Sequence, residues 1–288
     1  MTTQNKKKTS VLKRRRRFSS AVSARNKRRR PGAKASLWPV LYSDIVLLSI
    51  VFATLSFVYL DQMAAERRKL ADPAILDFFQ MITDIGKSEW ILIPSGLLCL
   101  LLVFVDWQGL ARRQQVWLSG LLFDAWFLFL TIAGSGIIVL TLKQLAGRAR
   151  PKHLETLGID YFDPMRFEAS FTSFPSGHSV TIAAVATVLV LRLPKFKAVL
   201  VILALLIGLS RVMVGAHYPS DVIIGLTLGA LFTLFLARMF ATKNIGFRVR
   251  RNGPIETGLP IRRILRGASP MKLKDMFSLA KRLVGFSS

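Results

Sequence analysis

Six long apolar blocks dominate this chain of 288 residues and constrain its fold more than any other feature. Blocks of this kind approach the roughly 20 residues that a helix needs to cross the hydrocarbon core of a bilayer. A water-soluble domain would have too little polar surface to cover them. The sequence therefore predicts an all-α integral membrane protein with six transmembrane helices. They are expected at residues 41–60, 90–107, 116–142, 179–193, 197–214 and 222–241.

The fourth block, residues 179–193, is short for a membrane span. We therefore expect its helix to begin at or before His178 and to lie against protein rather than lipid.

Asp124 falls inside the third block, near the end that is predicted to face the cytoplasm. A carboxyl group at that depth is expected to make an interhelical hydrogen bond or to extend toward the cytoplasmic membrane surface, rather than to belong to a functional site.

Residues 72–85, between the first two blocks, have the pattern of an amphipathic helix. Asp72 is placed to cap this helix, Pro73 suits its first turn and Gly86 suits its end. Four apolar side chains are expected on one face: Ile75, Phe78, Phe79 and Ile82. The segment is predicted to lie on the outer membrane surface.

Positive charge is concentrated outside the apolar blocks, in a chain with a formal net charge of +25. Residues 1–40 contain 14 Lys or Arg and no acid, and residues 238–282 contain 12. Because cytoplasmic segments collect basic residues, both termini are predicted to lie in the cytoplasm. We expect a basic, disordered cytoplasmic tail at 1–40, a membrane domain at 41–241 and a basic cytoplasmic tail at 242–288.

The two basic tails favour one kind of partner. Lys and Arg clusters beside a membrane are attracted to anionic lipid headgroups. Neither tail interleaves its basic residues with aromatic ones, so no nucleic-acid partner is expected. The single cysteine, Cys99, lies in the second block, which excludes an intramolecular disulfide and a cysteine metal site. The sequence predicts no oligomeric state.

The first of three polar clusters is KQLAGRARP, residues 143–151, where the third block ends. Lys143 and Arg150 are seven residues apart, so both side chains can face one direction from a helix. The planar Arg fork and the compact Lys ammonium both suit phosphate oxygens. Arg148 and Lys152 are expected only to contact lipid headgroups.

The second cluster, Pro175-Ser176-Gly177-His178, directly precedes the fourth block. Ser176 is a candidate N-cap, and Gly177 allows backbone N–H groups to approach an anion closely at the start of a helix. His178 is then placed at the mouth of such a site, where it could donate a proton to a leaving oxygen. An ordinary helix cap followed by an incidental histidine explains this fragment equally well.

The third cluster, SRVMVGAHYPSD at residues 210–221, joins the last two blocks. Arg211 adds a cation, His217 follows in a short turn and Asp221 opens the final helix. An Asp close to a His can accept the proton on Nδ1, which leaves the other ring nitrogen free as a nucleophile. Two His and one Asp could instead bind a divalent metal ion, but three nearby cations oppose that use. With the topology above, all three clusters lie on the outer side of the membrane.

Together the clusters resemble the three-part signature of the type 2 phosphatidic acid phosphatase superfamily, which reads K-x6-RP, PSGH and SR-x5-H-x3-D. Every signature position is matched. The matching residues are Lys143, Arg150, Pro151, Pro175, Ser176, Gly177, His178, Ser210, Arg211, His217 and Asp221. The resemblance covers residues 143–221 in motif and about 41–241 in predicted topology.

The resemblance implies a lipid phosphatase that works through a phosphohistidine, without a metal or an organic cofactor. His217 would attack phosphorus and Asp221 would orient it. His178 would protonate the leaving lipid oxygen and later activate water, whereas the third histidine, His153, has no matching role. The phosphate would be held by Lys143, Arg150, Ser176, Gly177 and Arg211, with Pro151, Pro175 and Ser210 as supporting motif residues.

The implied substrate is a membrane lipid phosphate presented from the outer leaflet of a bacterial inner membrane. Lipid A, undecaprenyl diphosphate, phosphatidylglycerol phosphate and phosphatidic acid all fit, and we favour lipid A or an undecaprenyl carrier. Residues 152–174 are expected to help form the access to the site. Their acids are expected to shape headgroup selection: Glu155, Asp160, Asp163 and Glu168.

Two other functions remain open at this point. A phosphotransferase would use the same phosphohistidine and pass the phosphate to a second lipid. A non-catalytic membrane anchor would use its basic tails to recruit partners.

Overall fold

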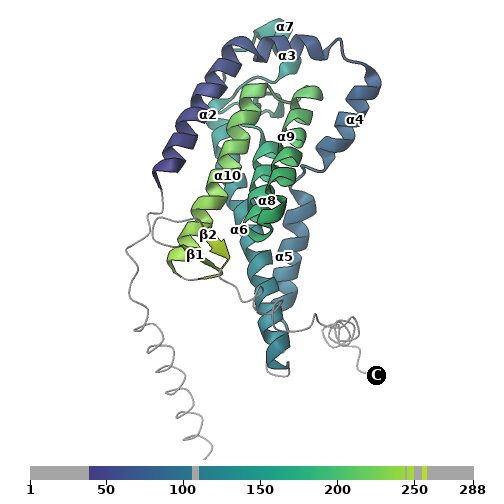
Figure 1. Ribbon diagram of the computed structural model, residues 1–288. Helices are drawn as coiled ribbons and strands as arrows, with labels where there is room; N and C mark the ends of the chain where they lie inside the picture. Colours follow the sequence, from purple (N-terminus) through teal and green to yellow (C-terminus); the bar gives the residue numbers. More distant parts are fainter. Residues whose placement is uncertain (1–38, 106–109, 244, 250–254, 258–288) are drawn as a thin grey trace, which may run out of the picture.

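The computed structural model describes residues 39–105, 110–243, 245–249 and 255–257. They form a bundle of long helices, with shorter helices across one end (Figure 1). The long helices follow the predicted apolar blocks. They are α2 (Val40–Tyr59), α5 (Glu89–Val103), α6 (Arg112–Ala146), α8 (Gly177–Arg192), α9 (Lys197–Met213) and α10 (Pro219–Thr242). Residues 1–38 of the tail predicted at 1–40, and most of the tail predicted at 242–288, lie outside the described residues.

Membrane-spanning length and composition are met by five helical segments among the described residues. They are Val40–Tyr59, Pro73–Val103, Gln114–Ala146, Pro194–Met213 and Pro219–Thr242. α8, with 16 residues, is a shorter apolar helix. It packs against α6, α9 and α10, so the expectation that it lies beside protein is confirmed. The all-α membrane fold is confirmed as well, while the count of six spans depends on α8 and stays a prediction.

The outward faces of the long helices are apolar. On α2, the side chains of Leu47, Leu48 and Phe52 are each more than half exposed. An apolar surface of this size would be unfavourable in water, whereas in a bilayer it contacts lipid acyl chains. The bundle is therefore built to be surrounded by acyl chains.

Two glycines bring α8 and α10 into close contact. A Cβ atom on Gly229 would lie 2.2 Å from the carbonyl oxygen of Val180, and one on Gly225 would lie 2.7 Å from that of Ser176. Only glycine permits so close a backbone approach. At the same contact the Ser176 amide donates to the Asp221 carbonyl over 3.1 Å, which ties the start of α8 to the start of α10.

The helix predicted at 72–85 is present as α4 (Pro73–Asp84), and α3 (Asp61–Arg68) precedes it. The Asp72 carboxylate accepts a hydrogen bond from the Ala74 amide over 2.7 Å, which confirms the predicted cap. The expected apolar face is divided, because Ile82 is buried while Ile75 and Phe78 are about half exposed. α4 packs against α9, and its position on the membrane surface stays a prediction.

The far end of the bundle carries a short hairpin that the sequence analysis did not predict. Strands β1 (Phe247–Val249) and β2 (Ile255–Thr257) pair antiparallel beside α10. Phe247 is buried, with its ring 4.7 Å from that of Phe127. Arg192 lies over the Phe247 ring and pairs with Asp124, which confirms the interhelical role expected for that carboxyl group.

The connections at the opposite end hold most of the polar clusters. They include α3, η1 (Pro151–His153), α7 (Leu154–Leu157) and η2 (Ala169–Phe171), whereas η3 (Pro194–Phe196) joins α8 to α9. The start of α2 and the β1–β2 hairpin lie at the other end of the bundle from α3 and α7 (Figure 1).

Candidate active site

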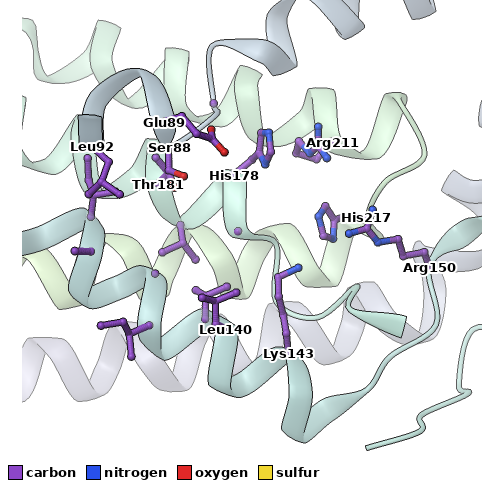
Figure 2. A pocket seen from close by; sticks show the side chains of 18 residues that line it. Ser88, Glu89, Leu92, Leu140, Lys143, Arg150, His178, Thr181, Arg211 and His217 are labelled. Carbon is purple, nitrogen blue, oxygen red and sulfur yellow. The ribbon is translucent and has the colours of Figure 1, made fainter. Parts of the chain in front are cut away.

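The three polar clusters meet in one cavity of about 660 Å³. It is bounded by the end of α6, the start of α8, the end of α9 and the turn before α10. Figure 2 shows the imidazoles of His178 and His217 beside the Arg211 side chain, with Lys143 and Arg150 reaching toward the same space. Residues predicted from three separate motifs are thus brought together.

Threonine oxygens hold the three cations of this cavity. Lys143 Nζ donates to the Thr172 carbonyl over 2.5 Å, and Arg150 Nη2 lies 3.4 Å from Thr172 Oγ1. Arg211 Nη1 donates to Thr83 Oγ1 over 2.5 Å. Within the described part of the chain, the buried Nε atoms of both arginines have no hydrogen-bond partner. The cavity therefore presents positive charge and free donors, as an anion site requires.

Two residues of the PSGH cluster line the cavity, and the other two are buried beneath it. Gly177 begins α8 and lines the cavity together with His178. Ser176 occupies the predicted N-cap position, but its hydroxyl makes no capping bond and instead accepts from Ser179 Oγ over 2.9 Å. Ser176 is fully buried and does not line the cavity, so its side chain packs beneath the start of α8.

Two other motif residues also serve the packing. Ser210 is fully buried, and its hydroxyl donates to the Ile207 carbonyl within α9 over 2.6 Å. Pro175 is buried ahead of α8, and Pro151 begins η1. These side chains shape the helix ends, and none of them lines the cavity.

His217 is held by the backbone of the preceding cluster. It is 3% exposed, and its Nδ1 lies 2.7 Å from the Ser173 carbonyl oxygen. Because a carbonyl only accepts, the Nδ1 atom carries the proton and Nε2 keeps its lone pair. We expected Asp221 to accept that proton, but its Oδ2 is 3.8 Å from Nδ1, too far for a hydrogen bond.

Asp221 is fully buried and its carboxylate is saturated with donors. It accepts from Ser173 Oγ over 2.6 Å, from the Tyr218 amide over 3.0 Å and from Arg148 Nη1 over 2.6 Å. Ser173 therefore connects both groups, since its hydroxyl contacts Asp221 and its carbonyl contacts His217. A carboxylate so engaged is poorly disposed to bind a metal ion.

Arg148 corrects the sequence analysis. We expected it to contact lipid headgroups, but it is 1% exposed and pairs with both Asp221 and Asp61. Asp61 was missed entirely, because it lies 87 residues before Arg148 and outside every motif. No local pattern in the sequence indicates this pairing.

The acids of residues 152–174 are largely committed to surface pairs. Glu155 pairs with Lys69, while Asp163 and Glu168 both pair with Arg166. The acid that lines the cavity is instead Glu89, at the start of α5. The prediction that the loop acids select the headgroup is untested, and Glu89 is an additional candidate.

His153, for which the signature offers no role, packs against the same loop. Its ring stacks on that of Phe171 at a centroid distance of 5.2 Å. It is absent from the residues that line the cavity.

Burial gives His217 a pH dependence that can be measured. Burial lowers the pKa of His217 from 6.5 to about 4, Asp221 opposes this, and Lys143 lowers it further. The folded state thus binds this proton less readily than the unfolded state. The contribution of His217 to stability is therefore fully present above pH 6.5 and is lost as the pH falls toward 4, because the unfolded chain takes up the proton first.

We therefore expect the thermal midpoint of the wild type to fall between pH 6.5 and pH 4 more steeply than that of His217→Gln. Thermal unfolding in detergent at a series of pH values measures this difference. Parallel pH dependence in the two proteins would show that His217 is not held neutral.

Comparison with known proteins agrees with this geometry. The PAP2 superfamily matches residues 124–245. A lipid A 1-phosphatase from Rhizobium etli is 32% identical over 222 residues, covering 75% of this chain and 92% of that protein. A phosphatidylglycerophosphatase B from Bacillus subtilis is 31% identical over 190 residues, covering 62% and 81%. A crystal structure of a Bacillus subtilis transmembrane PAP2-type phosphatidylglycerolphosphate phosphatase is 24% identical, with a TM-score of 0.47 over 68% of this chain and 93% of that one.

The fold and the cavity define a class, that of helical integral-membrane proteins with a buried histidine facing a cationic pocket. Within that class the chain belongs to the PAP2 superfamily, because it is related to the Rhizobium etli protein over nearly all of that protein's length. It is a phosphatase.

Proposed function

We propose that this protein is a metal-independent lipid phosphatase that hydrolyses a phosphate monoester of a lipid A-type glycolipid. One observation carries the proposal: two histidines and three cations, drawn from three separate motifs, face a single cavity. The choice of lipid is supported by the two lipid A 1-phosphatases among the relatives, which are 32% and 34% identical to this chain.

In the first step, Nε2 of His217 attacks phosphorus and the bond from phosphorus to the lipid oxygen breaks. His178, across the same cavity, donates a proton to the departing oxygen. Because burial and the Arg211 charge lower the pKa of His178 to about 3 in the empty cavity, His178 must take up this proton together with the substrate phosphate, whose negative charge stabilises the imidazolium. The cations stabilise the charge that spreads over the phosphoryl oxygens, a contribution that grows in a cavity shielded from water. The proton on Nδ1 of His217 stays directed at the Ser173 carbonyl.

In the second step, His178 accepts a proton from water as the water oxygen attacks the phosphohistidine. The bond from phosphorus to nitrogen breaks, inorganic phosphate leaves and His217 returns to its neutral form. The phosphorylated imidazole carries positive charge, and Asp221 stands 3.8 Å from Nδ1 to offset it. Proton and phosphate are thus both accounted for without a further reactant.

The remaining cavity walls favour a lipid. Beside the cations, the cavity is lined by apolar side chains of three helices: Leu92, Ile132, Ile137, Val139, Leu140 and Val180. A soluble phosphate ester would gain nothing from these walls, whereas an acyl chain would bury apolar surface against them. We propose further that both termini lie in the cytoplasm and that the cavity opens on the opposite side.

A substrate panel tests the proposal. Purified full-length protein should release inorganic phosphate from lipid A in excess chelator, faster than from phosphatidylglycerol phosphate, undecaprenyl diphosphate or phosphatidic acid. Phosphate release and labelling of an acceptor lipid should be measured together. Complete loss of activity on chelation, or transfer to a lipid without free phosphate, would refute the hydrolase proposed here.

A further inference from the structure

Arg148 links the active site to a helix at the end of the bundle. Its Nη1 donates to Asp221 Oδ1 over 2.6 Å and to Ser220 Oγ over 2.8 Å. Its Nη2 donates to Asp61 Oδ2 over 2.8 Å. Arg148, Asp61 and Asp221 are at most 1% exposed, so the whole chain of contacts is shielded from solvent.

Asp61, the first residue of α3, accepts two hydrogen bonds from Ser220 in the first turn of α10. Its Oδ1 accepts from the Ser220 amide over 3.0 Å, and its Oδ2 accepts from Ser220 Oγ over 2.5 Å. Ser56 Oγ donates to Oδ1 over 3.2 Å. Asp61 therefore satisfies a free amide in the first turn of the helix that carries Asp221.

We propose that Asp61 and Arg148 are positioning residues, which hold Asp221 and, through it, His217 in the geometry for attack on phosphorus. The inference rests on the proposed function. The contacts run from Asp61 through Arg148 to Asp221, and from Asp221 through the Ser173 hydroxyl to the carbonyl that fixes the tautomer of His217.

The guanidinium is also fixed in its plane by aromatic rings. It lies 4.3 Å from the centre of the Tyr218 ring and 4.9 Å from that of Phe57. Contact with aromatic faces stabilises a cation and restricts its motion. The fork is thereby fixed with one nitrogen toward each carboxylate, a geometry that a flexible Lys ammonium cannot reproduce.

The electrostatic arrangement suits a reacting histidine. Two carboxylates share one guanidinium, so the cluster keeps one net negative charge beside His217. That charge is placed to stabilise the positive phosphohistidine, while Arg148 prevents Asp221 from rotating away. Removal of Arg148 would leave two buried carboxylates without their cation.

Activity measurements on the full chain test the positioning role. Asp61→Asn and Arg148→Lys should each lower kcat about 10-fold or more, an effect of the size known for outer hydrogen-bond partners of metal-site ligands. KM should change little, because neither residue lines the cavity. The double variant should lose no more than the worse single variant, since both changes break the same connection.

Glu66→Gln is the matched control for Asp61→Asn. It removes a carboxylate from the same helix, but Glu66 is exposed and its carboxylate accepts a hydrogen bond from Gln62 one turn away in α3. It should keep wild-type kcat. A folded Asp61→Asn protein with wild-type kcat, or losses that multiply in the double variant, would overturn the inference.

A readout independent of turnover separates this inference from the proposed function. The chain has three histidines, so NMR titration of histidine-labelled protein can follow His217 directly. Removing the charge of Asp61 should lower the pKa of His217, whereas Arg148→Met should raise it. The other charged groups that face His217 are unchanged in both variants: Lys143, Arg150, His178, Arg211 and Asp221.

General loosening of the fold would instead move the His217 pKa upward in both variants. Shifts of opposite sign would support the positioning role even if no lipid phosphate were a substrate. Two upward shifts, or none, would refute it. Absence of phosphate release by the wild type would refute only the proposed function.

Discussion

Replacing His217 with Gln is expected to reduce phosphate release from the lipid substrate by roughly 10⁴-fold or more, the scale seen when a covalent nucleophile is removed. The amide nitrogen of Gln has no lone pair suited to attack on phosphorus, so the covalent step is lost. Substrate binding should persist, because Lys143, Arg150 and Arg211 remain. Steady-state phosphate release, with substrate binding measured separately, checks this expectation.

His153→Gln is the matched control, since His153 stacks on Phe171 and lies outside the cavity. It should retain wild-type turnover. Rapid quenching of the wild type at neutral pH should also yield protein heavier by one phosphoryl group, bound at His217. A fully active His217→Gln enzyme would rule out the proposed nucleophile.

Gly229→Ala should destabilise the fold and lower activity although Gly229 does not line the cavity. The new Cβ would lie 2.2 Å from the Val180 carbonyl oxygen and 3.0 Å from its Cα, both backbone atoms that cannot turn aside. Overpacking of this kind costs about 1–3 kcal/mol or more. Separation of α8 from α10 would also draw His178 away from Asp221 and lower turnover, by about 10-fold or more if the misplacement approaches 1 Å.

Thermal unfolding and phosphate release measured on the same preparation test this expectation. Gly136→Ala is the control for the melting temperature alone: Gly136 lines the cavity, and a Cβ atom there meets no atom within 4 Å beyond its own helix turn. It should keep or raise the melting temperature, as Ala usually does in a helix interior. Equal melting temperatures for Gly229→Ala and the wild type would show that the helices can separate without cost.

Short sequence patterns predict the long helices, the signature residues and one helix cap. Runs of apolar residues predict the long helices because hydropathy is a property of each contiguous run, although the run that forms α8 is shorter than a span. The signature residues predict the cavity in the same way, since Lys143 and Arg150, or His217 and Asp221, lie within a few residues of each other. Asp72 was likewise identified as a cap because a helix start involves only neighbouring residues.

The errors arise where the partner is distant in sequence. The Arg148 guanidinium seemed a headgroup contact, because nothing near it reveals two carboxylates. The acceptor for His217 proved to be the Ser173 backbone, 44 residues away, and backbone carbonyls have no sequence signature. Phe247 could not be distinguished from tail residues until its contact with Phe127 was seen.

The sequence by itself therefore determined that the chain is a helical membrane protein carrying a three-part histidine signature. Hydropathy and short motifs are properties of contiguous segments, so they need no knowledge of the fold. Only the tertiary structure decided which groups hold the histidine and its carboxylate in place. The Asp61–Arg148–Asp221 contacts join α3, the segment that follows α6, and α10, and such pairings exist only once packing has brought these three segments together.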